Sequence, residues 1–136
     1  MGLANGKIHV VINDAPILEF DRSKPVPGQQ KRYLDNMDSR MENGIELNGE
    51  FIAAPNASQR SQFVASSMVN ALFAENYSLA VAMCTWLAER IPELKQVQVI
   101  GDPEGEMRID LMFDRDYQTT QAEQPIKFFN PKINNL

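Results

Sequence analysis

The chain has few of the side chains that carry out enzymatic chemistry. Its 136 residues include a single histidine, His9, and a single cysteine, Cys84. A structural zinc site needs several Cys or His ligands, and a Ser-His-Asp or Cys-His catalytic centre would have to use His9. His9 alternates with the β-branched residues Ile8 and Val10, which is typical of a strand residue. The sequence therefore predicts no metal site and no cofactor, and it leaves catalysis open but disfavoured.

Two further kinds of reactive site lack their sequence signals. Cys84 has no cationic neighbour in the sequence to activate its thiol, so we expect a packing residue. Neither of the glycine-rich patterns that cradle phosphates, GxGxxG or GxxxxGK[ST], occurs. One cysteine also rules out an internal disulfide, which fits a reducing cytoplasm.

The charge balance bears on partners. Eighteen acidic and 13 basic residues give a net charge of −5, which disfavours binding to nucleic-acid phosphates. No apolar run approaches the roughly 18 residues of a membrane span, and the first residues do not resemble a secretion signal. We therefore expect a cytoplasmic protein without membrane contact.

Basic residues gather early in the chain. The cluster is either a docking patch for an anion or a partner, or the solvated start of a helix whose charge nearby acidic residues balance, and we prefer the second interpretation. Its members are Arg22, Lys24, Lys31 and Arg32.

A tripeptide occurs twice, each time at the end of a predicted strand. The two copies are Phe20-Asp21-Arg22 and Phe113-Asp114-Arg115. If the strands end at the same edge, the two Asp-Arg pairs form a cluster of four charges that could hold an anionic ligand. The alternative is chance recurrence, which we consider the better explanation.

Hydrophobic periodicity predicts two hairpins and a pair of short arms. Alternation and turn residues place hairpins at both ends of the chain, over 7–13 with 17–20 and over 96–100 with 107–113. Asn48-Gly49, a strong hairpin signal, lies between arms of three residues each.

Three helices are predicted between the hairpins. The first covers 29–43 and ends at Gly44, which suits a positive φ. The second covers 57–74 after a capping box of Asn56 and Gln59. The third covers 78–91 and is stopped by Pro92.

This element order predicts an α+β fold. We expect an antiparallel sheet of three to five strands, built by joining the N-terminal and C-terminal hairpins, with about three helices packed on one face. The other face should be polar, since it carries His9, Gln96, Gln98, Arg108 and Asp110. A single domain spans 1–117, and 118–136 is a tail in which a polar linker precedes an apolar segment with Phe128 and Phe129. The tail either frays or docks on the body or on a second chain.

Because the sequence has few reactive residues, we expect the function to depend on the shape and surface of the protein. We expect a small non-enzymatic protein that acts through protein–protein contacts, as an adaptor, assembly factor or accessory subunit, and that pairs with itself as a homodimer. Seven methionines, which supply adaptable apolar surface, and the adjacent phenylalanines favour this hypothesis. The alternatives are a chaperone for a secreted or assembling client, and a sensor or enzyme that binds a small anion through Asp-Arg clusters. The candidate binding residues are Arg22, Lys24, Lys31, Arg32, Asp114, Arg115, Phe128 and Phe129.

Overall fold

The computed structural model describes residues 6–24, 26–102 and 104–114. Every predicted helix and strand is present, with ends that differ by a residue or two. In chain order they are β1 (Lys7–Ile12), β2 (Ala15–Asp21), α1 (Gly28–Glu42), β3 (Ile45–Leu47), β4 (Glu50–Ile52), α2 (Ala57–Phe73), α3 (Tyr77–Arg90), β5 (Gln96–Gly101) and β6 (Met107–Met112).

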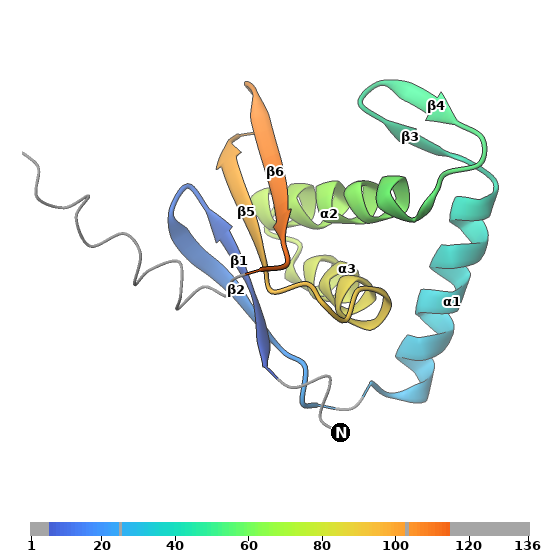
Figure 1. The fold of residues 1–136 in the computed structure, drawn as a ribbon, viewed down its shortest axis with the longest axis horizontal. Coiled ribbons are helices and arrows are strands. Elements are labelled where there is room, and N and C mark those ends of the chain that lie inside the picture. The colour runs from blue at the N-terminus through green and yellow to red at the C-terminus, as the bar shows by residue number, and fades with distance from the viewer. Residues whose placement is uncertain (1–5, 25, 103, 115–136) are drawn as a thin grey trace, which may run out of the picture.

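The two terminal hairpins join into one four-stranded sheet with the order β2-β1-β5-β6 (Figure 1). Each hairpin is antiparallel, but the central strands β1 and β5 pair in parallel, with Val10 opposite Val97. The sheet is therefore mixed, and the prediction of a purely antiparallel sheet was wrong in this respect. Joining two hairpins leaves the direction of the central pair open, and the helices between them return the chain to the end where β1 begins.

The molecule has three layers (Figure 1). Helices α2 and α3 form an antiparallel pair and cover one face of the sheet, whereas α1 lies on their side away from the sheet. Small residues let α2 and α3 approach closely, and Ala65 and Ala80 are fully buried between the layers. No described helix has the length and apolar character needed to cross a bilayer.

The predicted helix cap before α2 and the predicted turn between β3 and β4 are both present. The Asn56 side chain accepts a hydrogen bond from the Gln59 N–H at 2.8 Å, and the Gln59 side chain accepts one from the Asn56 N–H at 2.9 Å. This confirms the capping box at the start of α2. Asn48 and Gly49 have φ of 54° and 79°, the two positive values of a type I′ turn between β3 and β4.

The first hairpin differs from the expected one. Its turn is Asn13-Asp14 alone, and β2 already begins at Ala15, with Pro16 paired to Val11 where the register shifts. Pro16 is expected outside the strand from the sequence, because proline lacks an N–H. An edge strand with an irregular register tolerates it, since the missing donor is not needed for the ladder.

The sheet face opposite the helices agrees only in part with the predicted polar face. It carries polar side chains as predicted, and Gln98 donates a hydrogen bond to Gln96 at 2.9 Å. His9 and Gln96, however, are only 8% and 0% exposed. Phe113, the last residue of the predicted hairpin, lies beyond the end of β6 at Met112 and is 47% exposed.

Candidate functional site

Arg22 is buried rather than available on a surface patch. Its guanidinium donates hydrogen bonds to the carbonyl oxygens of Ala88 at 2.8 Å, Ile91 at 2.9 Å and Leu94 at 2.7 Å. These carbonyls lie at the end of α3 and in the turn after it, where a cation suits both the carbonyls without a donor in the helix and the helix dipole. Burial lowers the pKa of Arg22 from its ordinary value. The side chain ties the end of β2 to the end of α3.

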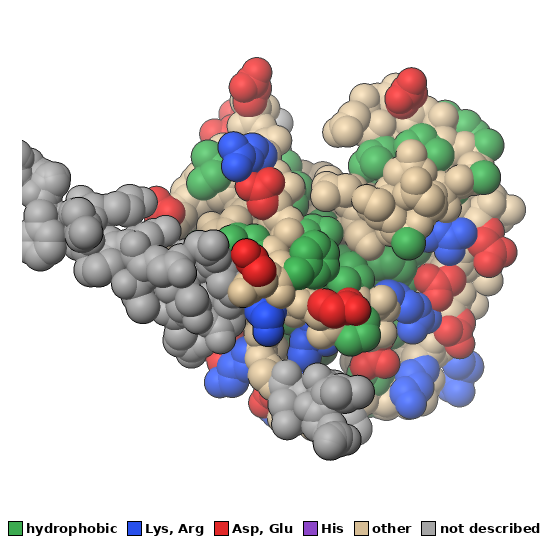
Figure 2. Space-filling view, in the orientation of Figure 1, with side chains coloured by type: hydrophobic (Ala, Val, Ile, Leu, Met, Phe, Trp, Pro, Cys, Tyr) green, Lys and Arg blue, Asp and Glu red, His purple; other side chains and the backbone are tan. Residues whose placement is uncertain are grey.

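The other predicted basic residues lie apart from Arg22. Lys24, Lys31 and Arg32 are exposed, the last two on the first turns of α1. Figure 2 shows basic and acidic side chains interspersed over α1 rather than a field of one sign. This arrangement is typical of a solvated helix face.

Asp21 at the end of β2 and Asp114 just after β6 lie at the same end of the sheet but on opposite edges. Strands β2 and β6 run in parallel with two strands between them, so their ends are about 14 Å apart at the usual strand spacing. Asp21 accepts hydrogen bonds from the N–H and hydroxyl of Ser23, at 2.9 and 2.7 Å. The predicted cluster of four charges includes Arg115, so it stays a prediction. Arg115, Phe128 and Phe129 lie outside the described residues, and so does the predicted tail 118–136.

The two reactive residue types are both in buried positions. Cys84 is fully buried in α3, and burial raises the pKa of its thiol to about 12. A thiol held neutral in this way is a poor nucleophile. No group of three or more metal-ligating side chains occurs in the described part of the chain.

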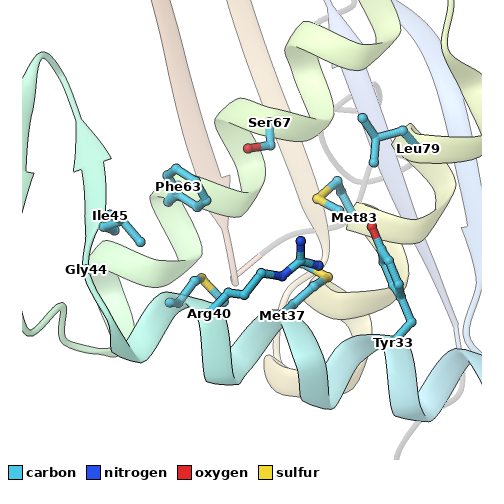
Figure 3. A pocket seen from close by; sticks show the side chains of 10 residues that line it. Tyr33, Met37, Arg40, Gly44, Ile45, Phe63, Ser67, Leu79 and Met83 are labelled. Atoms are coloured by element: carbon cyan, nitrogen blue, oxygen red, sulfur yellow. The ribbon is translucent and has the colours of Figure 1, made fainter.

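A cleft between the three helices is the best candidate site (Figure 3). It has a volume of about 310 Å³ and opens to solvent. Most of its wall is apolar and comes from α1, α2 and α3, in particular from Tyr33, Met37, Met41, Phe63, Leu79 and Met83. Methionine side chains are unbranched and polarizable, so this wall can adapt to apolar groups of different shape.

Few polar groups reach this cleft. Arg40 and Tyr33 of α1 point their guanidinium and hydroxyl toward it, and Ser67 faces them from α2 (Figure 3). Among the described residues Arg40 has no acidic partner within ion-pair distance. An apolar cleft with a few convergent polar groups is the usual form of a binding site.

A second hollow continues the cleft along α1 and α3. It has a volume of about 420 Å³ and shares Tyr33 and Leu79 with the first hollow. Its surroundings are also apolar, since Leu79 is 37% exposed and Val81 40% exposed. The two hollows adjoin at Tyr33 and Leu79, and together we call them the helix groove.

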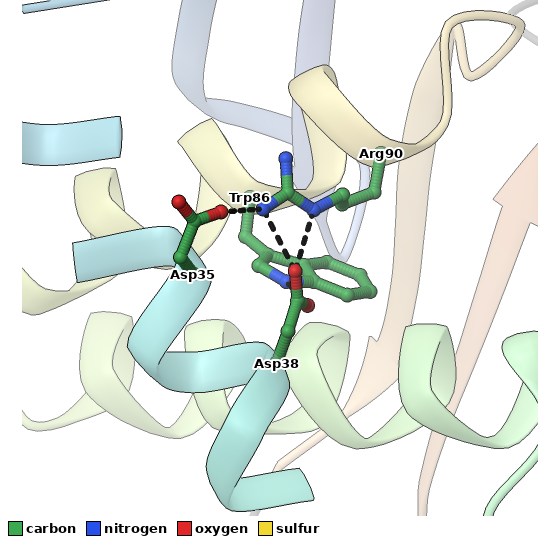
Figure 4. A network of polar contacts seen from close by, with 4 residues as sticks. All are labelled: Asp35, Asp38, Trp86 and Arg90. Atoms are coloured by element: carbon green, nitrogen blue, oxygen red, sulfur yellow. Dashed lines mark hydrogen bonds and ion pairs between the residues drawn. The ribbon is translucent and has the colours of Figure 1, made fainter. Parts of the chain in front are cut away.

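A polar network holds α1 in the position that forms the helix groove (Figure 4). Asp38 of α1 accepts a hydrogen bond from the indole N–H of Trp86 at 2.8 Å, and its other oxygen lies 2.7 Å from the Arg90 guanidinium. Arg90 also reaches Asp35, one turn earlier on α1, at 3.1 Å. The buried side chains Leu34 and Met37 complete the contact. One wall of the groove therefore depends on this network.

No protein family, curated protein or solved structure matches this chain.

Sequence patterns alone do not identify the helix groove. They assign Tyr33, Met37 and Met41 to one helix stripe and Phe63 and Met83 to inward faces, which is where these residues lie. Whether such stripes meet completely or leave a gap depends on helix crossing geometry. The abundance of methionine was the signal in the sequence, and Arg40 on the same side of α1 as the stripe was the second.

Proposed function

We propose that this protein is a non-enzymatic binding module that takes an apolar segment of a partner protein in the helix groove. The observation that carries the proposal is the pair of adjoining apolar hollows with Arg40, which has no acidic partner among the described residues, on the wall. An apolar groove between helices is a common receptor for peptide segments, and a wall rich in methionine accommodates varied side chains.

The chemistry of the wall specifies the partner segment. Large apolar side chains fill the hollows, and a carboxylate next to them pairs with Arg40. An arginine–carboxylate pair at the rim of an apolar groove adds specificity more than affinity, because like-charged or uncharged segments leave the guanidinium without a partner. The expected ligand is a segment that combines at least two large apolar residues with an Asp or Glu.

Selection from a random peptide library displayed on phage tests the proposal with the full chain as bait. Wild-type protein should enrich apolar peptides that carry an acidic residue, and Arg40→Glu should shift the enrichment toward basic ones. Arg32→Glu makes the same charge change at an exposed position of α1 outside the groove and should leave the selection unchanged.

A filled groove gives a second arm of the test. Ser67→Phe places a ring in the cleft and should weaken binding of a selected peptide by about tenfold or more. Asn70→Phe adds the same ring at an exposed position of α2 that does not line the cleft, and it serves as the control. Binding that persists in Ser67→Phe, or a selection that enriches no common pattern, would overturn the proposal.

The groove also supports the related hypothesis of a chaperone for a secreted or assembling client, because such a protein needs an extended apolar surface for an unfolded segment. A chaperone should bind the client only before the client folds, whereas an adaptor should bind the folded partner equally well. The hypothesis of an anionic ligand held by Asp-Arg clusters gains no support, since three backbone carbonyls already use the Arg22 guanidinium.

A further inference from the structure

The two edges of the sheet are protected to different degrees. Among the described residues β2 and β6 are the outermost strands, and each edge strand offers unpaired backbone N–H and C=O groups. β2 carries Pro16, which has no N–H, and its ladder is irregular where Val10 is followed by Val11. β6 has no proline and pairs with β5 in regular register from Met107 to Met112. The β6 edge is therefore the one suited to a further strand.

A hydrogen bond at the end of β6 shows which of its backbone groups face outward. The Lys95 N–H donates to the Met112 carbonyl at 2.8 Å, so the backbone of Met112 faces β5. Backbone direction alternates along a strand, and Arg108 and Asp110 consequently also face β5 with their N–H and C=O groups. The backbone groups of three residues point to the open edge, namely Met107, Ile109 and Leu111.

This edge is complementary to itself. If a second copy of β6 approaches antiparallel about a two-fold axis at Ile109, then Ile109 faces its own copy and Met107 faces Leu111 of the second copy. All three facing pairs are then of the hydrogen-bonded type, with about six backbone hydrogen bonds in total. The apolar side chains of these residues, partly buried against the core, would extend one layer across both copies.

Charge selects this register over its neighbours. Arg108 and Asp110 are 77% and 44% exposed in their side chains and form an ion pair within the strand at 3.0 Å. Figure 2 shows basic and acidic side chains side by side on this part of the surface. In the Ile109-centred register Arg108 lies opposite Asp110 of the second copy, twice, in the close non-hydrogen-bonded pairs. An axis at residue 108 would place Arg108 opposite itself, and an axis at 110 would place Asp110 opposite itself, both of which are repulsive.

We propose that two copies of this chain pair through β6, antiparallel and centred on Ile109, to form one continuous sheet. The surface lies away from the helix groove, so the proposal does not rest on the proposed function. It assigns the partner of the edge as a second copy because the charge pattern is self-complementary.

Charge exchange tests this pairing by sedimentation over a wide concentration series. Arg108→Asp and Asp110→Arg should each weaken the wild-type dimer by about tenfold or more, because each change creates two like-charged pairs across the axis. The double variant R108D/D110R should restore the dimer. A mixture of the two single variants should form a heterodimer, since one chain is then acidic at both positions and the other chain is basic at both.

The ion pair on the other edge strand supplies the control. Lys7 and Glu19 lie 2.6 Å apart on β1 and β2, and the exchange K7E/E19K should leave the dimer unchanged. Hydrogen exchange adds a second measurement, in which the amides of Ile109 and Leu111 gain protection with dimer formation and those of Arg108 and Asp110 do not. A monomer at all concentrations, or a dimer that neither single variant weakens, would overturn the proposal.

Discussion

Replacing Arg22 with methionine should be among the most destabilising single substitutions in this protein. The variant keeps an unbranched side chain of similar length and removes the guanidinium. The carbonyl oxygens of Ala88, Ile91 and Leu94 each lose a hydrogen bond at once. Ile91 keeps another donor, the Leu94 N–H at 3.1 Å, whereas no other donor to Ala88 and Leu94 is seen among the described residues. Two of these three hydrogen bonds are buried and the third is partly buried, so water cannot replace the donor freely.

Two opposing effects decide the magnitude. Removing the guanidinium relieves the burial of a charge, the effect that lowers the pKa of Arg22. Against this, each buried carbonyl without a donor costs about 1–3 kcal/mol, and hydrogen bonds to a charged group contribute about 1.5–3 kcal/mol each. The carbonyls belong to the backbone and stay buried in the variant. The cost of the lost hydrogen bonds therefore exceeds the gain from removing a buried charge. We expect Arg22→Met to lower the free energy of unfolding by about 3–5 kcal/mol, a large part of the stability of a small domain.

Urea denaturation followed by circular dichroism and by the fluorescence of Trp86, the only tryptophan, provides the assay. Arg22→Lys should lose about half as much, because an ammonium group cannot reach three carbonyls in the geometry of the guanidinium fork. Arg32→Met, an exposed change on α1, should stay within about 0.5 kcal/mol of wild type. If Arg22→Met also stayed within that range, the clamp between β2 and α3 would contribute nothing and the reasoning would be refuted.

Three further predictions concern the helix network, the cysteine and the turns. Asp38→Ala should lower the free energy of unfolding by about 1–3 kcal/mol and shift Trp86 emission, whereas Asp38→Asn, which keeps an acceptor for the indole, should lose less. Equal losses in both variants would contradict the assignment. Burial raises the pKa of Cys84 from 9.0 to about 12, so the unfolded chain releases the thiol proton at a lower pH than the folded chain does. Above pH 9 the free energy of unfolding should therefore fall by about 1.4 kcal/mol per pH unit, relative to that of Cys84→Ala at each pH. If the difference in free energy of unfolding between wild type and Cys84→Ala stayed constant above pH 9, this prediction would be wrong. Gly101→Ala should destabilise the protein strongly, because a Cβ at this position would lie 2.0 Å from the Glu106 carbonyl oxygen and φ is +107°. At Gly49 φ is +79° but a Cβ would meet open space, so Gly49→Ala should lower the free energy of unfolding by only about 1 kcal/mol in the same urea assay. Similar losses at both glycines would be the wrong outcome.

The fold was predictable wherever its determinants are close together in the chain. The capping box of Asn56 and Gln59 and the positive-φ pair Asn48-Gly49 each act over a few residues. Alternation in β5 and β6 and the apolar stripe of α1 likewise depend on local periodicity. These signals suffice to predict the class of fold, the number of helices and the two terminal hairpins.

The site needed contacts between distant segments. Arg22 looks like a surface charge beside Lys24, and only the approach of the end of α3, more than 60 residues later, turns it into a clamp on backbone carbonyls. His9 and Gln96 alternate like solvent-facing residues, yet both are buried on β1 and β5, which become neighbouring central strands only when the two hairpins join.

The helix groove has the same origin. The sequence contains the methionine, aromatic and arginine residues that line the groove. Hydrophobic periodicity then assigns the apolar ones to helix faces. Whether three such faces close completely or leave a gap depends on the angle and distance at which α1 meets α2 and α3. The network of Asp38, Trp86 and Arg90 sets that distance. Local chemistry thus determined the elements of this protein, and tertiary packing alone decided which of its side chains are buried, paired or left open for a partner, because burial is a property of neighbours that the chain brings together only when it folds.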